Sequence, residues 1–151
     1  MSRVQLALNV SDLQESIDFY TKFFGTGPTK IRPGYANFAL DAPPLKLVLI
    51  EGAGAPGSVN HLGVEVFSPE EVADAIIRLD AEDFATDIEE NTTCCYAVQD
   101  KVWVAGPDNA RWEIYTVLSD AASAEAIAGD GRCCAPEPTN SDKGSSATTC
   151  C

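Results

Sequence analysis

Cysteine occurs in this chain only as adjacent pairs. Two neighbouring cysteines bridge to each other poorly, because the linkage would close a strained ring that departs from normal disulfide geometry. They can instead present two soft sulfur donors to a thiophilic centre such as Cd(II), Zn(II) or trivalent arsenic. The pairing therefore predicts soft-element chemistry. The six cysteines lie at Cys94-Cys95, Cys133-Cys134 and Cys150-Cys151.

A second candidate centre combines Gln5, His61 and Glu113, each in a segment that alternates apolar and polar residues. By that alternation, all three side chains point away from the apolar face of their strand. One imidazole nitrogen and two oxygen donors form a variant of the 2-His-1-carboxylate set, which holds non-haem Fe(II) and leaves coordination positions open. Taken singly, each residue has a structural interpretation as a hydrogen-bonded or solvated strand residue.

The pair Cys94-Cys95 has a structural alternative too, because a single cysteine in a strand often behaves as a small buried apolar residue. Consecutive side chains of a regular strand point to opposite faces, so joint chelation requires a loop or a bulge. The polar residues 89–93 would supply a loop edge just before the pair. Lys101 is a further candidate for a substrate contact, with an exposed strand lysine as the alternative.

An internal repeat indicates how these residues are positioned. Residues 4–10 (VQLALNV) resemble residues 60–66 (NHLGVEV), and both segments alternate with period two, as strands with one apolar face do. Gln5 and His61 hold equivalent positions in the two copies. The sequence therefore places them on equivalent strands, facing the same interior.

Each repeated strand is followed by the start of a helix. Ser11 with Gln14, and Ser68 with Glu71, have the spacing of a capping box, and Pro69 suits the first helical turn. Apolar residues then recur at helical spacing over 13–24 and 72–79. Short strand candidates come next, at 35–40 and 45–50 in the first half, and at 95–98, 101–105 and 111–117 in the second.

These elements define a βαβββ unit used twice, and hence an α+β fold. We expect one domain over residues 1–118, with modules at about 1–51 and 59–118 whose mixed sheet curls into a cup. Residues 119–151 are rich in small and polar residues and are expected to form a flexible, disordered tail with a short helix at 121–128. The two further cysteine pairs lie in this tail.

Composition narrows the possible partners. The 151 residues are 45% apolar, enough for a core, and carry a net charge of −13 with a pI near 4.2. Such an excess of carboxylates argues against nucleic acid and anionic membrane as partners. No apolar run reaches the roughly 20 residues of a spanning helix, and no signal-peptide pattern is present. A cytoplasmic location with reduced cysteines is therefore expected.

The motifs together resemble the vicinal oxygen chelate superfamily, which includes glyoxalase I and the extradiol dioxygenases. Within it, the chain resembles the arsenic-inducible carbon–arsenic lyases and the cadmium-induced proteins of actinobacteria. The resemblance covers about residues 1–118. It is carried by the repeated units and by the segments 1–8, 33–39, 44–49, 60–66, 93–104 and 106–114.

The resemblance implies an Fe(II)-dependent dioxygenase that splits the carbon–arsenic bond of trivalent organoarsenicals, such as methylarsenite and trivalent aromatic arsenicals, and releases arsenite. O2 would be the second substrate. The metal ligands of that family match Gln5, His61 and Glu113, and its substrate-binding thiols match Cys94 and Cys95.

Two other functions remain open from the sequence. The cysteine pairs would also suit a non-catalytic protein that binds cadmium or arsenite. A glyoxalase-like isomerase would need a fourth metal ligand that acts as a base, yet the apolar segment 47–50 occupies the place expected for it. The chain could act as a monomer or a homodimer, with its modules paired within one chain or swapped between two.

Overall fold

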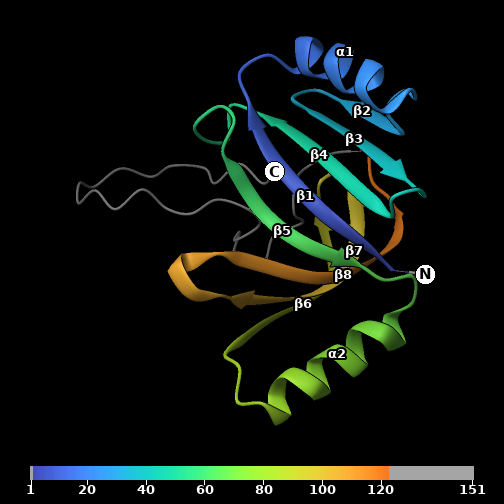
Figure 1. The fold of residues 1–151 in the computed structure, drawn as a ribbon. Helices are drawn as coiled ribbons and strands as arrows, with labels where there is room; N and C mark the ends of the chain where they lie inside the picture. The colour runs from blue at the N-terminus through green and yellow to red at the C-terminus, as the bar shows by residue number, and fades with distance from the viewer. Residues whose placement is uncertain (1, 123–151) are drawn as a thin grey trace.

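The computed structural model describes residues 2–122, which form eight strands and two α-helices. Figure 1 shows the strands curling into one sheet, with the helices at opposite ends of the molecule. In chain order the elements are β1 (Arg3–Val10), α1 (Leu13–Phe24), β2 (Lys30–Arg32), β3 (Tyr35–Leu40), β4 (Leu45–Glu51), β5 (Val59–Glu65), α2 (Pro69–Ala81), β6 (Thr86–Cys94), β7 (Ala97–Ala105) and β8 (Arg111–Asp120).

The eight strands form a single mixed sheet in the order β2-β3-β4-β1-β5-β8-β7-β6. Each module keeps its first strand parallel to its last, β1 with β4 and β5 with β8. The modules join through antiparallel pairing of β1 with β5. The expected α+β fold of two tandem βαβββ modules is therefore confirmed, and β1 and β5 join the two modules of this one chain.

The helix ends follow from local sequence, with one correction. Ser68 caps α2 by accepting a hydrogen bond from the backbone of Glu71, as expected, and Pro69 opens the helix. For α1 the cap is Asp12 and not Ser11: its carboxylate accepts from the backbone N–H of Glu15. Both residues can cap. Gly25 ends α1 in the left-handed conformation that glycine adopts without steric cost.

The sheet has two differently used faces. On the outer face, Ile17 of α1 packs against Phe38 of β3 and Leu49 of β4. Helix α2 covers the second module in the same way, with Val72 and Leu79 buried. The inner face carries a separate apolar cluster together with most of the candidate site residues. The helices thus cover the outer face of the sheet, and the candidate site residues lie on its inner face.

Four expectations about the strands need correction. β2 and β6 are absent from the predicted strands, and residues 89–93 lie within β6 rather than in a loop. The expected strands 95–98 and 101–105 are one strand, β7, which starts at Ala97. β6 is an edge strand with largely polar residues, so no apolar alternation marks it. β8 continues to Asp120, two residues past the expected domain boundary at 118.

Much of the expected tail lies outside the described residues. This holds for the expected disorder, for most of the helix expected at 121–128, and for Cys133-Cys134 and Cys150-Cys151. Among residues 2–122, neither helix is long and apolar enough to cross a membrane.

Candidate functional site

The junction between the modules brings Gln5, His61 and Glu113 together. Gln5 lies on β1, His61 on β5 and Glu113 on β8, which are neighbouring strands. Their register places Gly63 opposite both Gln5 and Glu113. The three side chains face the interior of the curled sheet and are 4%, 3% and 3% exposed. Residues 108 positions apart in sequence thereby share one small polar centre.

The side chains of the three residues lie within hydrogen-bonding distance of one another. The Nε2 of Gln5 is 2.6 Å from Oε1 of Glu113 and 3.0 Å from Nε2 of His61. Nε2 of His61 is 3.3 Å from the same carboxylate oxygen. The hydroxyl of Tyr115 donates to Oε1 of Gln5. Thus the imidazole, amide and carboxylate converge on one point, and each has a hydrogen-bonding partner.

Lys101 keeps the Glu113 carboxyl ionised. Its ammonium donates to Oε2 of Glu113 at 3.0 Å, and the lysine is 1% exposed, so the alternative of an exposed strand lysine is wrong. Burial by itself raises the pKa of Glu113, but the charge of Lys101 is the largest opposing effect, and that pKa lies well below its usual range. The site therefore holds a carboxylate with one oxygen on Lys101 and the other toward His61.

The chemistry of this donor set fits a divalent metal. Carboxylate oxygen, amide oxygen and imidazole nitrogen all bind Fe(II), and three ligands leave positions open. A half-turn of the Gln5 amide exchanges its ends, so that Oε1 faces His61 while Nε2 donates to the oxygen of Tyr115. Within residues 2–122, no cluster of three His, Cys, Asp or Glu side chains has metal-binding geometry, because the third member here is an amide.

Cys94 and Cys95 lie at the tip of the β6–β7 hairpin. Cys94 is the last residue of β6 and pairs with Ala97, so Cys95 and Tyr96 form a two-residue turn. Both turn residues have positive φ, 54° and 60°, as a type I′ turn requires and as glycine or asparagine usually supplies. Because the chain reverses here, the two thiols meet: their sulfurs are 3.4 Å apart.

Contacts from the first module and from Ala121 hold this strained turn in place. The carbonyl of Tyr96 accepts from Nζ of Lys30 at 3.2 Å and from the backbone of Ala121 at 2.9 Å. The Tyr96 hydroxyl donates to the carbonyl of Pro33 at 3.1 Å. Unfavourable φ values persist only where surroundings impose them, and they gather at functional sites. The thiols are therefore held as an adjacent pair before any ligand arrives.

Trp103 connects the thiol pair with the polar centre. It belongs to the inner apolar cluster that contains Cys94, and its ring makes an edge contact with His61 at a centroid distance of 5.4 Å. Tyr35 lies in the same cluster. Burial, followed by the charge of Cys95, raises the pKa of Tyr35 far above its usual value. The thiols, His61 and Glu113 thus share one interior.

Two buried polar atoms in this interior have no hydrogen-bond partner within the described residues. They are the indole Nε1 of Trp103 and Oε1 of Gln99. The other end of the Gln99 amide donates to the carbonyl of Cys94 at 3.3 Å, which places this residue beside the thiols. Buried polar groups are normally satisfied, so orphaned ones indicate a place where water or a bound ligand supplies the partner.

Sequence reasoning missed several residues that build this centre. Asn60, Gly63, Trp103 and Tyr115 were not singled out, although Trp103 and Tyr115 lie at alternate positions from Lys101 and Glu113 and so share their faces. Extending the strand alternation would have found these two. Gly63 also carried a signal, since a glycine inside a strand often marks a close approach.

Gly63 is expected to be intolerant of a side chain. A Cβ there would lie 3.0 Å from Cγ and 3.3 Å from the backbone oxygen of Glu113, so Gly63→Ala should push this candidate ligand out of position. We expect Fe(II) affinity to fall by roughly 10–100-fold, as for changes that disturb ligand orientation. Anaerobic titration calorimetry measures it. Gly27→Ala is the matched control, since a Cβ there meets nothing within 4 Å; equal affinity in both variants would contradict this role.

Lys101→Met should destabilise the metal-free protein by roughly 3–5 kcal/mol at neutral pH, because it leaves the Glu113 carboxylate buried without its cation. The depressed pKa of Glu113 contributes stability above its unfolded value of about 4.3, and this contribution is lost as pH falls through the folded pKa. Without Lys101 this contribution to stability disappears. The stability gap between variant and wild type should therefore narrow below about pH 4.

Urea unfolding at a series of pH values tests this gap. Lys46→Met is the matched control, because Lys46 is also buried and paired with a carboxylate, that of Glu65. Arg3 still pairs with Glu65 in that variant, so its loss should be smaller. A stability gap for Lys101→Met that stays constant with pH would show that Lys101 does not control the charge of Glu113.

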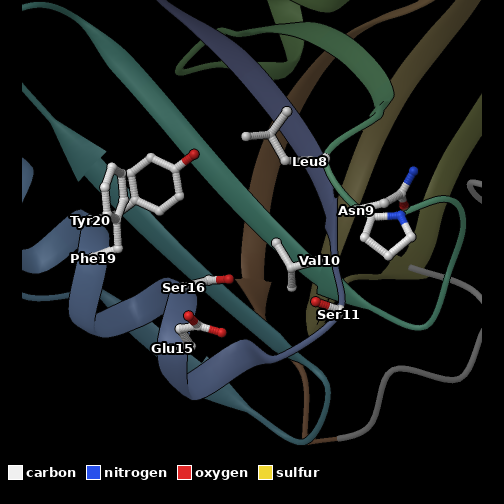
Figure 2. Close-up of a pocket in the computed structure, with 10 residues that line it drawn as sticks. Leu8, Asn9, Val10, Ser11, Glu15, Ser16, Phe19 and Tyr20 are labelled. Carbon is white, nitrogen blue, oxygen red and sulfur yellow. The ribbon is translucent and has the colours of Figure 1, made fainter.

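A separate pocket of about 300 Å³ lies where β1 meets α1. Figure 2 shows Ser16 and Tyr20 of α1 facing Leu8 and Val10 of β1 across it. None of the candidate site residues lines this pocket. The pocket therefore lies apart from the candidate site.

Comparison with known proteins places the chain in a family. Residues 3–114 match the model of the Glyoxalase/Bleomycin resistance protein/Dioxygenase superfamily. A trivalent organoarsenical cleaving enzyme of Thermomonospora curvata is 55% identical over the full length of both chains. The cadmium-induced protein CadI of Mycobacterium tuberculosis is 58% identical over 80% of this chain and 79% of its own.

Solved structures support the fold. The Mn(II)-bound glyoxalase from Novosphingobium aromaticivorans is 16% identical, with a TM-score of 0.57 over 83% of this chain and 43% of its own. An extradiol ring-cleaving dioxygenase from B. fuscum is 17% identical, with a TM-score of 0.55 over 83% of this chain and 34% of its own. The chain therefore belongs to the glyoxalase, bleomycin resistance protein and dioxygenase superfamily, and within it to the group that holds the organoarsenical cleaving enzymes.

Proposed function

We propose that this protein is an Fe(II)-dependent dioxygenase-type lyase that cleaves the carbon–arsenic bond of trivalent organoarsenicals and releases arsenite. The observation that carries the proposal is the pair Cys94-Cys95, with sulfurs 3.4 Å apart, in the same interior as Gln5, His61 and Glu113. The name of the relative from Thermomonospora curvata supports the substrate class. Methylarsenite and trivalent aromatic arsenicals are the proposed substrates, with O2 as co-substrate.

Capture of the arsenical would be a ligand exchange. The thiols of Cys94 and Cys95 replace two hydroxyl groups on trivalent arsenic, forming two As–S bonds and releasing two molecules of water, with no change of oxidation state. The hairpin turn already holds the sulfurs side by side, so little ordering remains to be done on binding. The organic group stays on arsenic and lies among Tyr35, Trp103 and the other members of the inner apolar cluster.

Gln5, His61 and Glu113 would hold the iron. When bound, Fe(II) supplies open positions and electrons for the activation of O2. The chain keeps the ligands in the required state: Lys101 maintains Glu113 as a carboxylate, and Tyr115 orients the Gln5 amide. Trp103 and Tyr35 exclude bulk water from the same interior. Holding arsenic by two bonds makes attack on its carbon effectively intramolecular.

Sequestration of cadmium or arsenite without catalysis is the second candidate, motivated by the CadI relatives and by the adjacent thiols of Cys94 and Cys95. A glyoxalase-like isomerase has less support. The β4 residues that pair with Gln5, Ala7 and Asn9 are Lys46, Val48 and Ile50, so that strand offers no carboxylate base. The absence of such a base on β4 therefore favours oxidative cleavage over isomerisation.

The deciding experiment uses full-length protein purified without O2 and loaded with Fe(II). Methylarsenite is added with and without O2, and released arsenite is separated and quantified. We expect arsenite only when Fe(II) and O2 are both present. If the arsenical stays bound in stoichiometric amount and no O2-dependent arsenite forms, the protein is a sequestering protein and the proposal is wrong.

A further inference from the structure

A chain of hydrogen bonds runs from the linker between the modules to the imidazole of His61. The hydroxyl of Ser58 donates to the carbonyl of Ala55 at 2.6 Å. Nδ2 of Asn9 donates to that hydroxyl at 2.8 Å, and Nδ2 of Asn60 donates to Oδ1 of Asn9 at 2.9 Å. Oδ1 of Asn60 then lies 2.7 Å from Nδ1 of His61. The four bonds connect the linker to a proposed metal ligand.

The direction of every hydrogen bond in this series is fixed by the carbonyl of Ala55, where the series ends. A backbone carbonyl only accepts, so Ser58 must donate to Ala55 and accept from Asn9. Each amide has one donating and one accepting end. Because Asn9 donates to Ser58, its oxygen must accept, and it accepts from the NH2 group of Asn60. Asn60 therefore presents its oxygen to Nδ1 of His61, and Nδ1 must carry the proton.

We propose that Asn60 is a positioning residue that fixes His61 as the Nδ1–H tautomer. Nε2 is then unprotonated, and its lone pair faces Gln5 and Glu113. The contact on the other side of the ring agrees, since Nε2 of Gln5 donates to Nε2 of His61 at 3.0 Å. The tautomer follows from hydrogen bonding alone, whereas its use in holding Fe(II) rests on the proposed function.

A local irregularity in the sheet lets Asn60 reach this position. Neighbours in a regular strand point to opposite faces, so Asn60 should face away from His61. The β1–β5 pairing shifts at this point: Ala7 pairs with His61 and Leu8 pairs with Val59, which leaves Asn60 without a partner on β1. Bulges of this kind redirect a side chain and occur beside active sites.

The linker is packed closely around the middle of the chain of bonds. Asn9 is buried, and its backbone exchanges hydrogen bonds with Ser58 and Gly57. Gly54 lies so close that a Cβ there would be 2.7 Å from Nδ2 of Asn9. The Asn9 amide therefore has little room to turn over. This packing gives the glycine-rich linker a second role besides joining the modules.

The single histidine makes the tautomer directly measurable. Full-length, metal-free protein labelled with 15N-histidine gives one imidazole in long-range 1H–15N spectra, recorded where those spectra show a neutral ring. We expect a protonated Nδ1 and an unprotonated Nε2 in the wild type. Asn60→Ala should lose this preference, because Nε2 can then protonate and donate to Glu113, 3.3 Å away. Asn60→Asp should restore Nδ1–H, because a carboxylate can only accept.

Metal affinity gives the second readout. Asn60→Ala should weaken Fe(II) binding by roughly 10–100-fold, and Asn60→Asp should recover most of it. If Asn60→Ala does not fold, Ser58→Ala is the second variant. It removes the hydroxyl that orients the Asn9 amide and should yield a mixture of tautomers. A wild-type ring protonated on Nε2, or an unchanged tautomer in Asn60→Ala, overturns the inference. A correct tautomer without any Fe(II) binding instead overturns the proposed function.

Discussion

Replacing His61 with alanine should abolish tight Fe(II) binding and, with it, the O2-dependent release of arsenite. His61 is the only imidazole in the chain and lies within 3.3 Å of both other proposed ligands, so no neighbouring side chain can replace its nitrogen. We expect Fe(II) affinity to fall by more than about 100-fold, beyond the range typical of residues that only support a ligand. Anaerobic calorimetry with Fe(II), followed by the arsenite assay, measures both effects.

The control for His61→Ala is Thr116→Ala. Thr116 is also a buried polar residue next to the junction. Along β8, Glu113 and Tyr115 point to one face of the sheet and Thr116 points to the other. It should keep wild-type Fe(II) affinity. Capture of arsenicals by the thiols should survive in His61→Ala. Undiminished arsenite release by that variant would remove His61 from the metal site.

Changing both Cys94 and Cys95 to serine should give the second large effect. Here substrate capture should be lost while Fe(II) binding is kept. Serine keeps the size of the side chains but lacks the soft sulfur that binds trivalent arsenic. Arsenite release at low substrate should fall by at least about 1,000-fold, because the intramolecular advantage of a captured substrate is lost. Fe(II) affinity should remain within about threefold of wild type, since neither thiol is among the proposed ligands.

The chain supplies a matched control for this variant. Cys133→Ser with Cys134→Ser removes another adjacent pair, and the difference between the two double variants isolates the effect of position. We expect full arsenite release at saturating substrate from the tail variant. If the Cys94 and Cys95 double variant loses Fe(II) instead of arsenical, the thiols belong to the metal site and the assigned roles are wrong.

The parts of the fold that could be predicted are those with local signals. The repeat between residues 4–10 and 60–66 located β1 and β5, and the Ser68-Pro69 start located α2. β6 could not be found, because an edge strand with a mostly polar sequence carries no periodic signal. The start of α1 was misplaced by one residue because Ser11 and Asp12 are both good caps.

The site could be predicted only in part, for a similar reason. Strand alternation located Gln5, His61 and Glu113 on inner faces, but it could not give their separations, which depend on how strands far apart in sequence are aligned. The meeting of Cys94 with Cys95 depends on a tight turn that lacks the usual glycine or asparagine. The burial of Lys101 depends on a partner 12 residues away across the β7–β8 hairpin.

The alignment of the strands also reveals a broken twofold symmetry within the chain. Gln5 and His61 are equivalent positions of the two modules, as are Ala7 and Gly63. Gly63 is aligned with Glu113, and Ala7 is aligned with Val48. Val48 is therefore the counterpart of Glu113 in the first module.

A fully symmetric centre would have four polar corners, whereas this one has three. The fourth is the valine side chain of Val48, which belongs to the same cluster as Cys94. The difference between the two modules thus lies on the side of the thiols. The two modules therefore supply a similar framework, and its one apolar corner packs in the same cluster as Cys94.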